Sequence, residues 1–265
     1  MLAHKIVNLE DNNIIGDLKL VNAIVEFKGK NNILYCQNQI TVANVKIRFT
    51  GNNSLIFLDS NAEEISLNIR VGNDSVFYLG KNAYINRISN MYATERKNII
   101  IGNEFLLAEG NTFRTADPHL IYDTQTLKRI NYSKSILVGD HVWIGQNGLI
   151  LKGTTIGSGA IIGGHSVLSN KKIKSNTLYA GNPARKIKEN IFYASPKSTH
   201  NFTLDDEIDS DTFNDYSFVY QKDENTLDFE KIDVDLKNLK SAHEKLNYII
   251  KNISSNQNKN RFYYE

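Results

Sequence analysis

The sequence predicts a mainly β protein, a parallel β-helix followed by a C-terminal extension that contains an α-helix. Three observations predict this fold class. Apolar residues recur at every sixth position through the middle of the chain, and segments that begin with Gly-Lys-Asn or Gly-Asn recur every 21 or 22 residues nearer the N-terminus. Steps of three and four between apolar residues, which are typical of a helix, appear only near the C-terminus. We expect the β-helix to occupy residues 1–192 and the extension to occupy residues 193–265.

The composition is that of a globular protein with balanced charge. Of 265 residues, 41% are hydrophobic, and 31 Lys and Arg residues against 29 Asp and Glu residues give a net charge of +2. This balance excludes a general binder of nucleic acid or of a membrane surface, but it leaves room for a local basic patch. The first residues lack the apolar run of a signal peptide, and no stretch approaches the roughly 20 apolar residues that cross a bilayer. We therefore expect a cytoplasmic protein without a membrane span.

The six-residue step defines the central coils. It places apolar residues at Val138, Ile144, Ile150, Ile156, Ile162 and Leu168. Lys174 then interrupts the step and Ala180 resumes it, while an earlier run of the same step passes through Ile101, Leu107 and Phe113. In a parallel β-helix each such unit forms one short strand and turn whose apolar side chain points inward, so that three units complete a coil of about eighteen residues.

Longer coils are predicted for the N-terminal part. The segments GKNNILY, GNNSLIF and GNDSVFY begin at Gly29, Gly51 and Gly72, at spacings of 22 and 21 residues. These spacings indicate coils with extra turn residues. Glycine and asparagine suit such turns because both adopt positive φ at low cost.

Two segments depart from the repeats. Residues 121–135 are too polar to form a buried strand, so we expect them to protrude as a loop, and such loops often carry function. After Pro196 the chain becomes acidic and aromatic, and helical steps then predict a single amphipathic helix. Its apolar face comprises Leu236, Leu239, His243, Leu246, Ile250 and Ile253.

The run RTADPHLIYD, residues 114–123, contains the main candidate for chemistry. His119 stands six residues after Phe113, follows a proline, and lies between Asp117 and Asp123. An imidazole acts as a general base near neutral pH, and a carboxylate on its other nitrogen would fix the tautomer. A histidine that merely closes a turn is the alternative, and the sequence leaves open which carboxylate would orient the ring.

A metal site is not expected. A carbonic anhydrase of this fold would need three histidines on a zinc ion, including a close pair. His141 and His165 take the same place in their six-residue units, but a separation of 24 residues does not stack one on the other.

Two runs resemble a known family. GDHVWIGQNGLILKGTTIGSGAIIGGHSVLSNKKIKSNTLYAGNPARKIKENI resembles the C-terminal coils of the left-handed β-helix acetyltransferases through its VWIG strand, its stepped IG repeat and its closing AGNPA. This similarity covers roughly residues 99–192. RTADPHLIYD followed by KRIN resembles the capsular and lipooligosaccharide acetyltransferases, most closely the polysialic acid O-acetyltransferases.

The resemblance implies a left-handed coil, acetyl-CoA as the donor, and a homotrimer with active sites between subunits. It also implies that His119 is the catalytic base and that Trp143, the only tryptophan, has a functional role. Asp117 is the carboxylate that we assign beside the base. The flat indole of Trp143 would line the acetyl end of the cofactor or position the acceptor sugar.

Acyl transfer requires further groups. The developing oxyanion needs N–H donors, for which the turn glycines Gly145 and Gly163 are candidates. The phosphates of coenzyme A need cations, and the resemblance places the cofactor near the last coils. The candidate cations are Lys171, Lys172, Arg185 and Lys186. Three further cations are candidates for binding an anionic acceptor such as sialic acid: Arg114, Lys128 and Arg129.

These observations predict an acetyl-CoA-dependent O-acetyltransferase that modifies a hydroxyl of a surface-glycan sugar, with sialic acid the favoured acceptor. Two alternatives stay open. One keeps the fold and the donor but acetylates an amine on a nucleotide sugar. The other is a solenoid scaffold without catalysis, because a fold does not by itself imply chemistry.

Overall fold

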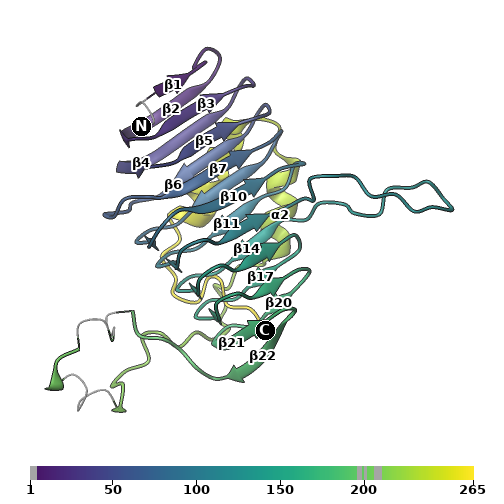
Figure 1. The fold of residues 1–265 in the computed structure, drawn as a ribbon. Coiled ribbons are helices and arrows are strands. Elements are labelled where there is room, and N and C mark those ends of the chain that lie inside the picture. The colour runs from purple at the N-terminus through teal and green to yellow at the C-terminus, as the bar shows by residue number, and fades with distance from the viewer. Residues whose placement is uncertain (1–4, 196–198, 200–201, 206–210) are drawn as a thin grey trace.

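The strands stack in parallel, one coil upon the next, so that three sheets run along a common axis (Figure 1). The computed structural model describes residues 5–195, 199, 202–205 and 211–265. The predicted parallel β-helix is confirmed. It begins at Lys5, earlier than the clear repeats of the sequence.

Each sheet takes one strand from successive coils. Sheet A contains β1 (Lys5–Val7), β3 (Ile24–Phe27), β5 (Lys46–Phe49), β7 (Leu67–Val71), β10 (Ser89–Ala93), β13 (Thr112–Arg114), β16 (Leu149–Leu151) and β19 (Val167–Leu168). Sheet B contains β2 (Asn13–Val21), β4 (Ile33–Ala43), β6 (Leu55–Leu58), β8 (Val76–Leu79), β11 (Ile99–Ile101), β14 (Ile136–Val138), β17 (Thr155–Ile156) and β20 (Lys172–Ile173). Sheet C contains β9 (Tyr84–Ile85), β12 (Leu106–Leu107), β15 (Trp143–Ile144), β18 (Ile161–Ile162), β21 (Thr177–Gly181) and the antiparallel β22 (Ala184–Glu189).

The apolar residues of the six-residue step fill the interior. All six from Val138 to Leu168 are fully buried. The prediction that the six-residue step resumes at Ala180 is wrong. Ile156 pairs with Ile173, and Ile162 pairs with Tyr179. The final coil is therefore one residue shorter than the coil before it, and Lys174 and Ala180 do not hold interior positions.

The protruding loop leaves the solenoid after β13 and returns at β14. Ile99 pairs directly with Ile136, and the Asn98 amide donates to Ser135 Oγ across 37 residues of sequence. Figure 1 shows the excursion as a long loop that runs out from the coils and back again. An antiparallel bridge between Tyr122 and Arg129 holds its two arms together.

The C-terminal extension covers the outer face of sheet B. In the part that the structure describes in full, it contains the α-helices α2 (Phe229–Asn238) and α3 (Ala242–Ile249) and the π-helical turn η3 (Ile250–Ser254). The single helix expected from the sequence is thus divided. Leu239 is extended, and Ser241 starts a new helix through a capping box with Glu244.

Apolar packing and the buried cation Arg261 hold the extension in place. Helix side chains such as Ile232 and Ile249 pack against outward-facing residues of sheet B such as Phe57. The buried Arg261 donates to Asp140 at 2.9 and 2.7 Å, which pairs the charge that burial would otherwise penalise. Among the described residues no helix is both long enough and apolar enough to traverse a membrane.

The turn glycines differ in how closely the next coil approaches them. A Cβ on Gly51 would lie 2.3 Å from the Asn73 amide nitrogen, whereas a Cβ on Gly72 would lie 3.3 Å from its nearest neighbour, Thr94 Cα. We predict that Gly51→Ala lowers the free energy of unfolding by about 1–3 kcal/mol, because backbone atoms must move. Gly72→Ala should lower the free energy of unfolding by clearly less than Gly51→Ala. Urea denaturation of the two variants checks this, and equal midpoints would contradict it.

Candidate active site

His119 is presented at the base of the loop from an anchored backbone. Its carbonyl oxygen accepts a hydrogen bond from Asn131 Nδ2 at 2.8 Å, while its side chain is exposed. Within the described ranges no hydrogen bond or ion pair engages its imidazole. The ring is therefore accessible to a substrate, although its main chain is fixed.

Asn131 ties the two arms of the loop together. Its buried amide donates to Asp117 Oδ2 at 2.9 Å as well as to the His119 carbonyl. Its Oδ1 accepts from the Ile121 amide at 2.9 Å and from Arg129 Nε at 3.3 Å. Asn131 belongs to the run KRIN, which carried part of the family resemblance, but no role was predicted for this residue from the sequence.

Asp117 faces the solenoid. Its Oδ2 accepts from Lys152 Nζ at 2.5 Å, and this bond is the main reason that its pKa lies below the ordinary value of 3.8, with the Asn131 bond acting in the same direction. Because the pKa is lowered, the pair contributes fully above that ordinary value and is lost only as the pH falls through the lower, folded value. The ion pair between Asp117 and Lys152 thus holds the base of the loop throughout the neutral pH range.

Asp123 instead closes the tip of the loop. Its Oδ1 accepts from the amides of Gln125 and Thr126 at 3.1 and 2.7 Å. Neither aspartate has a hydrogen bond to the His119 ring in the described chain. The role of Asp117 as the imidazole's partner therefore stays a prediction, and the structure gives it a second role as an anchor.

The three cations assigned to the acceptor have different surroundings. Arg129 forms an ion pair with Glu95, with Nη2 2.8 and 2.9 Å from the two carboxylate oxygens, and lies over the Tyr132 ring. Lys128 is exposed on the loop. Arg114 stands at the end of β13 with its guanidinium 5.0 Å from the centre of the Tyr92 ring.

The three sheets form the sides of a prism, and Trp143 lies on a different side from the strand that precedes His119. It belongs to sheet C, is 38% exposed, and is in register with Leu106 and Ile161. An outward-facing apolar column results, composed of Tyr84, Leu106, Trp143, Ile161 and Leu178.

An aromatic stack supports the indole from the side. Trp143 contacts Tyr193, with 5.6 Å between ring centres. Tyr193 stacks on His141 at 4.1 Å, and Phe218 covers the other face of that imidazole at 4.3 Å. His141 is fully buried, and its ring lowers the pKa of the neighbouring Glu104 carboxyl. The sequence offered no signal for this support, since His141 was considered only as a metal ligand.

The expected oxyanion donors are already occupied. The amides of Gly145 and Gly163 donate to the carbonyls of Ile162 and Tyr179, each at 2.8 Å. A Cβ on Gly145 would lie 2.6 Å from the Gly164 nitrogen, so this glycine permits close stacking of the coils. Neither amide is free to stabilise an oxyanion, which corrects that assignment, while contact of these turns with the cofactor stays a prediction.

The four cations assigned to coenzyme A lie in or next to the last strands of sheets B and C. Lys172, in β20 of sheet B, donates to Thr155 Oγ1 at 3.0 Å and lies 3.6 Å from Glu230. Lys186, in β22 of sheet C, donates to Glu189, and this bond raises the lysine's pKa. Lys171 and Arg185 have no carboxylate partner among the described residues. These two are the better candidates for binding phosphate.

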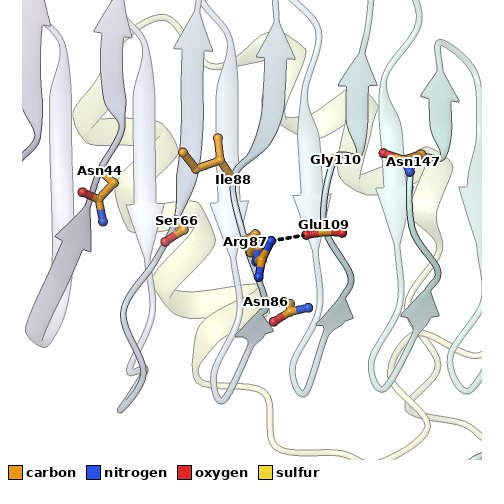
Figure 2. Close-up of a pocket in the computed structure, with 8 residues that line it drawn as sticks. All are labelled: Asn44, Ser66, Asn86, Arg87, Ile88, Glu109, Gly110 and Asn147. Atoms are coloured by element: carbon orange, nitrogen blue, oxygen red, sulfur yellow. Dashed lines mark ion pairs between the residues drawn. The ribbon is translucent and has the colours of Figure 1, made fainter.

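A cavity lies elsewhere, at the corner where sheet C passes into sheet A. Its volume is about 580 Å³, and Figure 2 shows Arg87 and Glu109 pointing toward each other across it, 3.2 Å apart. The lining residues are Asn44, Ser66, Asn86, Arg87, Ile88, Glu109, Gly110 and Asn147. His119 and Trp143 do not line it. No cluster of three His, Cys, Asp or Glu residues suited to a metal ion occurs in the described ranges.

Relatives of this chain are found among known proteins. No protein-family model matches. The polysialic acid O-acetyltransferase of Neisseria meningitidis is 33% identical over 178 residues, which are 67% of this chain and 82% of that protein. The enzyme of the same name from Escherichia coli O1:K1 / APEC is 32% identical over 135 residues, 49% of this chain and 44% of its own.

Two solved structures share the fold. The polySia-specific acetyltransferase NeuO is 28% identical, with a TM-score of 0.63, over 76% of this chain and 89% of its own. The polysialic acid O-acetyltransferase OatWY is 26% identical, with a TM-score of 0.56, over 77% of this chain and 98% of its own.

Asn131 makes hydrogen bonds to both arms of the loop, so its removal should loosen the loop. We predict that Asn131→Ala makes the segment 121–130 cleave at least about tenfold faster in limited proteolysis, since a buried hub of hydrogen bonds is lost. The thermal midpoint of the solenoid should change little. Gln125→Ala, at the exposed tip, is the matched control, and equal cleavage of the two variants would exclude Asn131 as the anchor.

Proposed function

The chain belongs to the hexapeptide-repeat acetyltransferases and is related to the polysialic acid O-acetyltransferases, and we propose that it transfers an acetyl group from acetyl-CoA to a hydroxyl of a sialic acid glycan. One observation carries this proposal: the accessible imidazole of His119 on a backbone fixed by Asn131. A base that must meet a bulky acceptor needs this combination of exposure and fixed position. The names of the relatives support the choice of a hydroxyl over an amine.

The reaction follows from the residues. His119 accepts the proton of the acceptor hydroxyl as the oxygen attacks the acetyl carbonyl of the thioester. The carbon–sulfur bond then breaks, and the proton passes from the imidazolium to the departing thiolate. A free alcohol is a poor nucleophile, so the base is essential to the rate. An acceptor that is already a neutral amine would need it far less.

A site shared between subunits accounts for the positions of His119 and Trp143. His119 follows a strand of sheet A, whereas Trp143 stands on sheet C. Within one chain they belong to different sides of the prism, which supports a homotrimer in which one subunit's loop meets its neighbour's sheet C. The column around Trp143 is apolar and partly exposed, and it suits both burial at such an interface and contact with an acetyl group.

Loss of the imidazole should stop the transfer. We predict that His119→Asn lowers kcat by about 100- to 10,000-fold, the usual contribution of a general base. The affinity for acetyl-CoA should stay within about twofold, because the base acts on the acceptor. Initial rates with acetyl-CoA and a sialic acid polymer measure this. His165→Asn, a substitution at another exposed histidine, is the matched control. Near-normal turnover by the His119 variant would contradict the proposal.

Substitution of a cation at the last coils should raise the KM for acetyl-CoA only where that cation has no carboxylate partner in the described part of the chain. Substituting Lys171 or Arg185 by Gln should raise the KM for acetyl-CoA about tenfold while kcat stays nearly constant, because phosphate contacts are equal in the ground state and the transition state. Lys172→Gln should leave this KM unchanged, since that lysine is bound to Thr155 and lies near Glu230. Steady-state kinetics at saturating acceptor distinguish them. Equal KM values in all three variants would place the cofactor elsewhere.

A further inference from the structure

An outward-facing row of residues on sheet A carries concentrated positive charge. Parallel pairing places Arg48 beside Arg70, Arg70 beside Tyr92, and Tyr92 beside Arg114. Neighbouring strands lie about 4.8 Å apart, so these four residues form a regular row, here called the cationic ladder. Its last member, Arg114, ends the strand from which the His119 loop departs.

The ladder is not neutralised at the end near the loop. Arg48 Nε lies 3.4 Å from Glu26, which stands one strand further toward the N-terminus. Arg70 and Arg114 have no carboxylate within ion-pair distance among the described residues. Instead, their guanidinium carbons lie 5.3 and 5.0 Å from the centre of the Tyr92 ring. The ring positions the two cations from the neighbouring strands and leaves their N–H groups available to an anion.

A polar column runs beside the ladder. Asn68 Nδ2 donates to Asn90 Oδ1 at 3.2 Å, and the adjoining position in β13 is Thr112. Between the ladder and this column lies a hollow of about 230 Å³, lined by Lys46, Arg48, Asn68, Ile69, Arg70 and Tyr92. Cations for carboxylates therefore stand beside amides and hydroxyls suited to sugar hydroxyls.

We propose that the cationic ladder binds the polymeric, carboxylate-bearing chain of the acceptor glycan and leads it toward His119. This inference rests on the proposed function, because it names where the acceptor of that reaction lies outside the catalytic residues. Arg70 and Arg114 are two strands apart, about 10 Å, so one sugar carboxylate does not reach both. A polymer contacts several members at once and gains affinity from each additional contact.

The surroundings favour a glycan over a nucleic acid. Single-stranded nucleic acids stack their bases on free aromatic faces. The only aromatic ring of the ladder, Tyr92, is covered by guanidinium groups from both neighbouring strands. No face of it remains for a base, whereas the Arg N–H groups and the amide column remain for carboxylates and hydroxyls.

Arg70→Gln tests the ladder without touching the proposed catalytic residues. We expect the KM for an α2,8-linked sialic acid polymer to rise about tenfold, the loss typical of one charge-assisted hydrogen bond. The kcat, the KM for acetyl-CoA and the KM for a sialic acid dimer should stay within about twofold. Tyr92→Ala should weaken polymer binding similarly and Tyr92→Phe should restore it, since the phenyl face still positions the cations. Lys237→Gln, on the exposed side of α2, is the charge-matched control.

Direct binding of fluorescently labelled polymer, without acetyl-CoA, separates this inference from the proposed function. Arg70-dependent binding by a protein that acetylates no sialic acid would support the ladder and overturn the function. Acetylation with the same KM in wild type and Arg70→Gln would overturn the ladder alone. Displacement of the polymer by single-stranded RNA or heparin at equal concentration would show a general polyanion surface and overturn the assignment to a glycan.

Discussion

Backbone hydrogen bonding between successive coils sets where the other features of this molecule lie. Because the strands of successive coils pair in parallel up to β21, equivalent positions of these coils line up in columns. The column inside the prism must be apolar, and the turns must let neighbouring backbones approach closely. The occupied amides of Gly145 and Gly163 are one consequence: groups that look available in the sequence are already used to hold the coils together.

The same stacking gives each side of the prism a uniform surface. Sheet B presents apolar columns, and the chain's own helices α2 and α3 cover them. Sheet C presents the partly exposed column that includes Trp143, and sheet A presents the cationic ladder. One side is therefore closed by the chain itself, while the other two carry the residues that we propose for acetyl transfer and for holding the acceptor. The loop with His119 departs where sheet A passes into sheet B, beside the ladder.

Much of the fold could be predicted because the repeats encode it locally. A six-residue step from Val138 to Leu168 leaves few alternatives to a β-helix, whereas its hand was implied only by the family resemblance. The one-residue shortening at Ile173 was missed because the interruption at Lys174 was treated as a single break in an otherwise unchanged step that resumes at Ala180. The division of the C-terminal helix was missed because its apolar period continues through Leu239, while Ser241 and Glu244 cap a new helix.

The candidate site was predictable only as a list of residue types. His119 was recognisable because it lies in an unusual run, but its anchoring by Asn131 and the contact of Asp117 with Lys152 join residues from separate segments. The ladder was also hidden, since Arg48, Arg70, Tyr92 and Arg114 are separated by 22 residues at each step and become neighbours only when the coils stack. Charge balance over the whole chain masks such a row, because Asp and Glu residues elsewhere cancel it in the total. In a solenoid, electrostatic character is therefore a property of each column, and it must be evaluated along the axis rather than along the sequence.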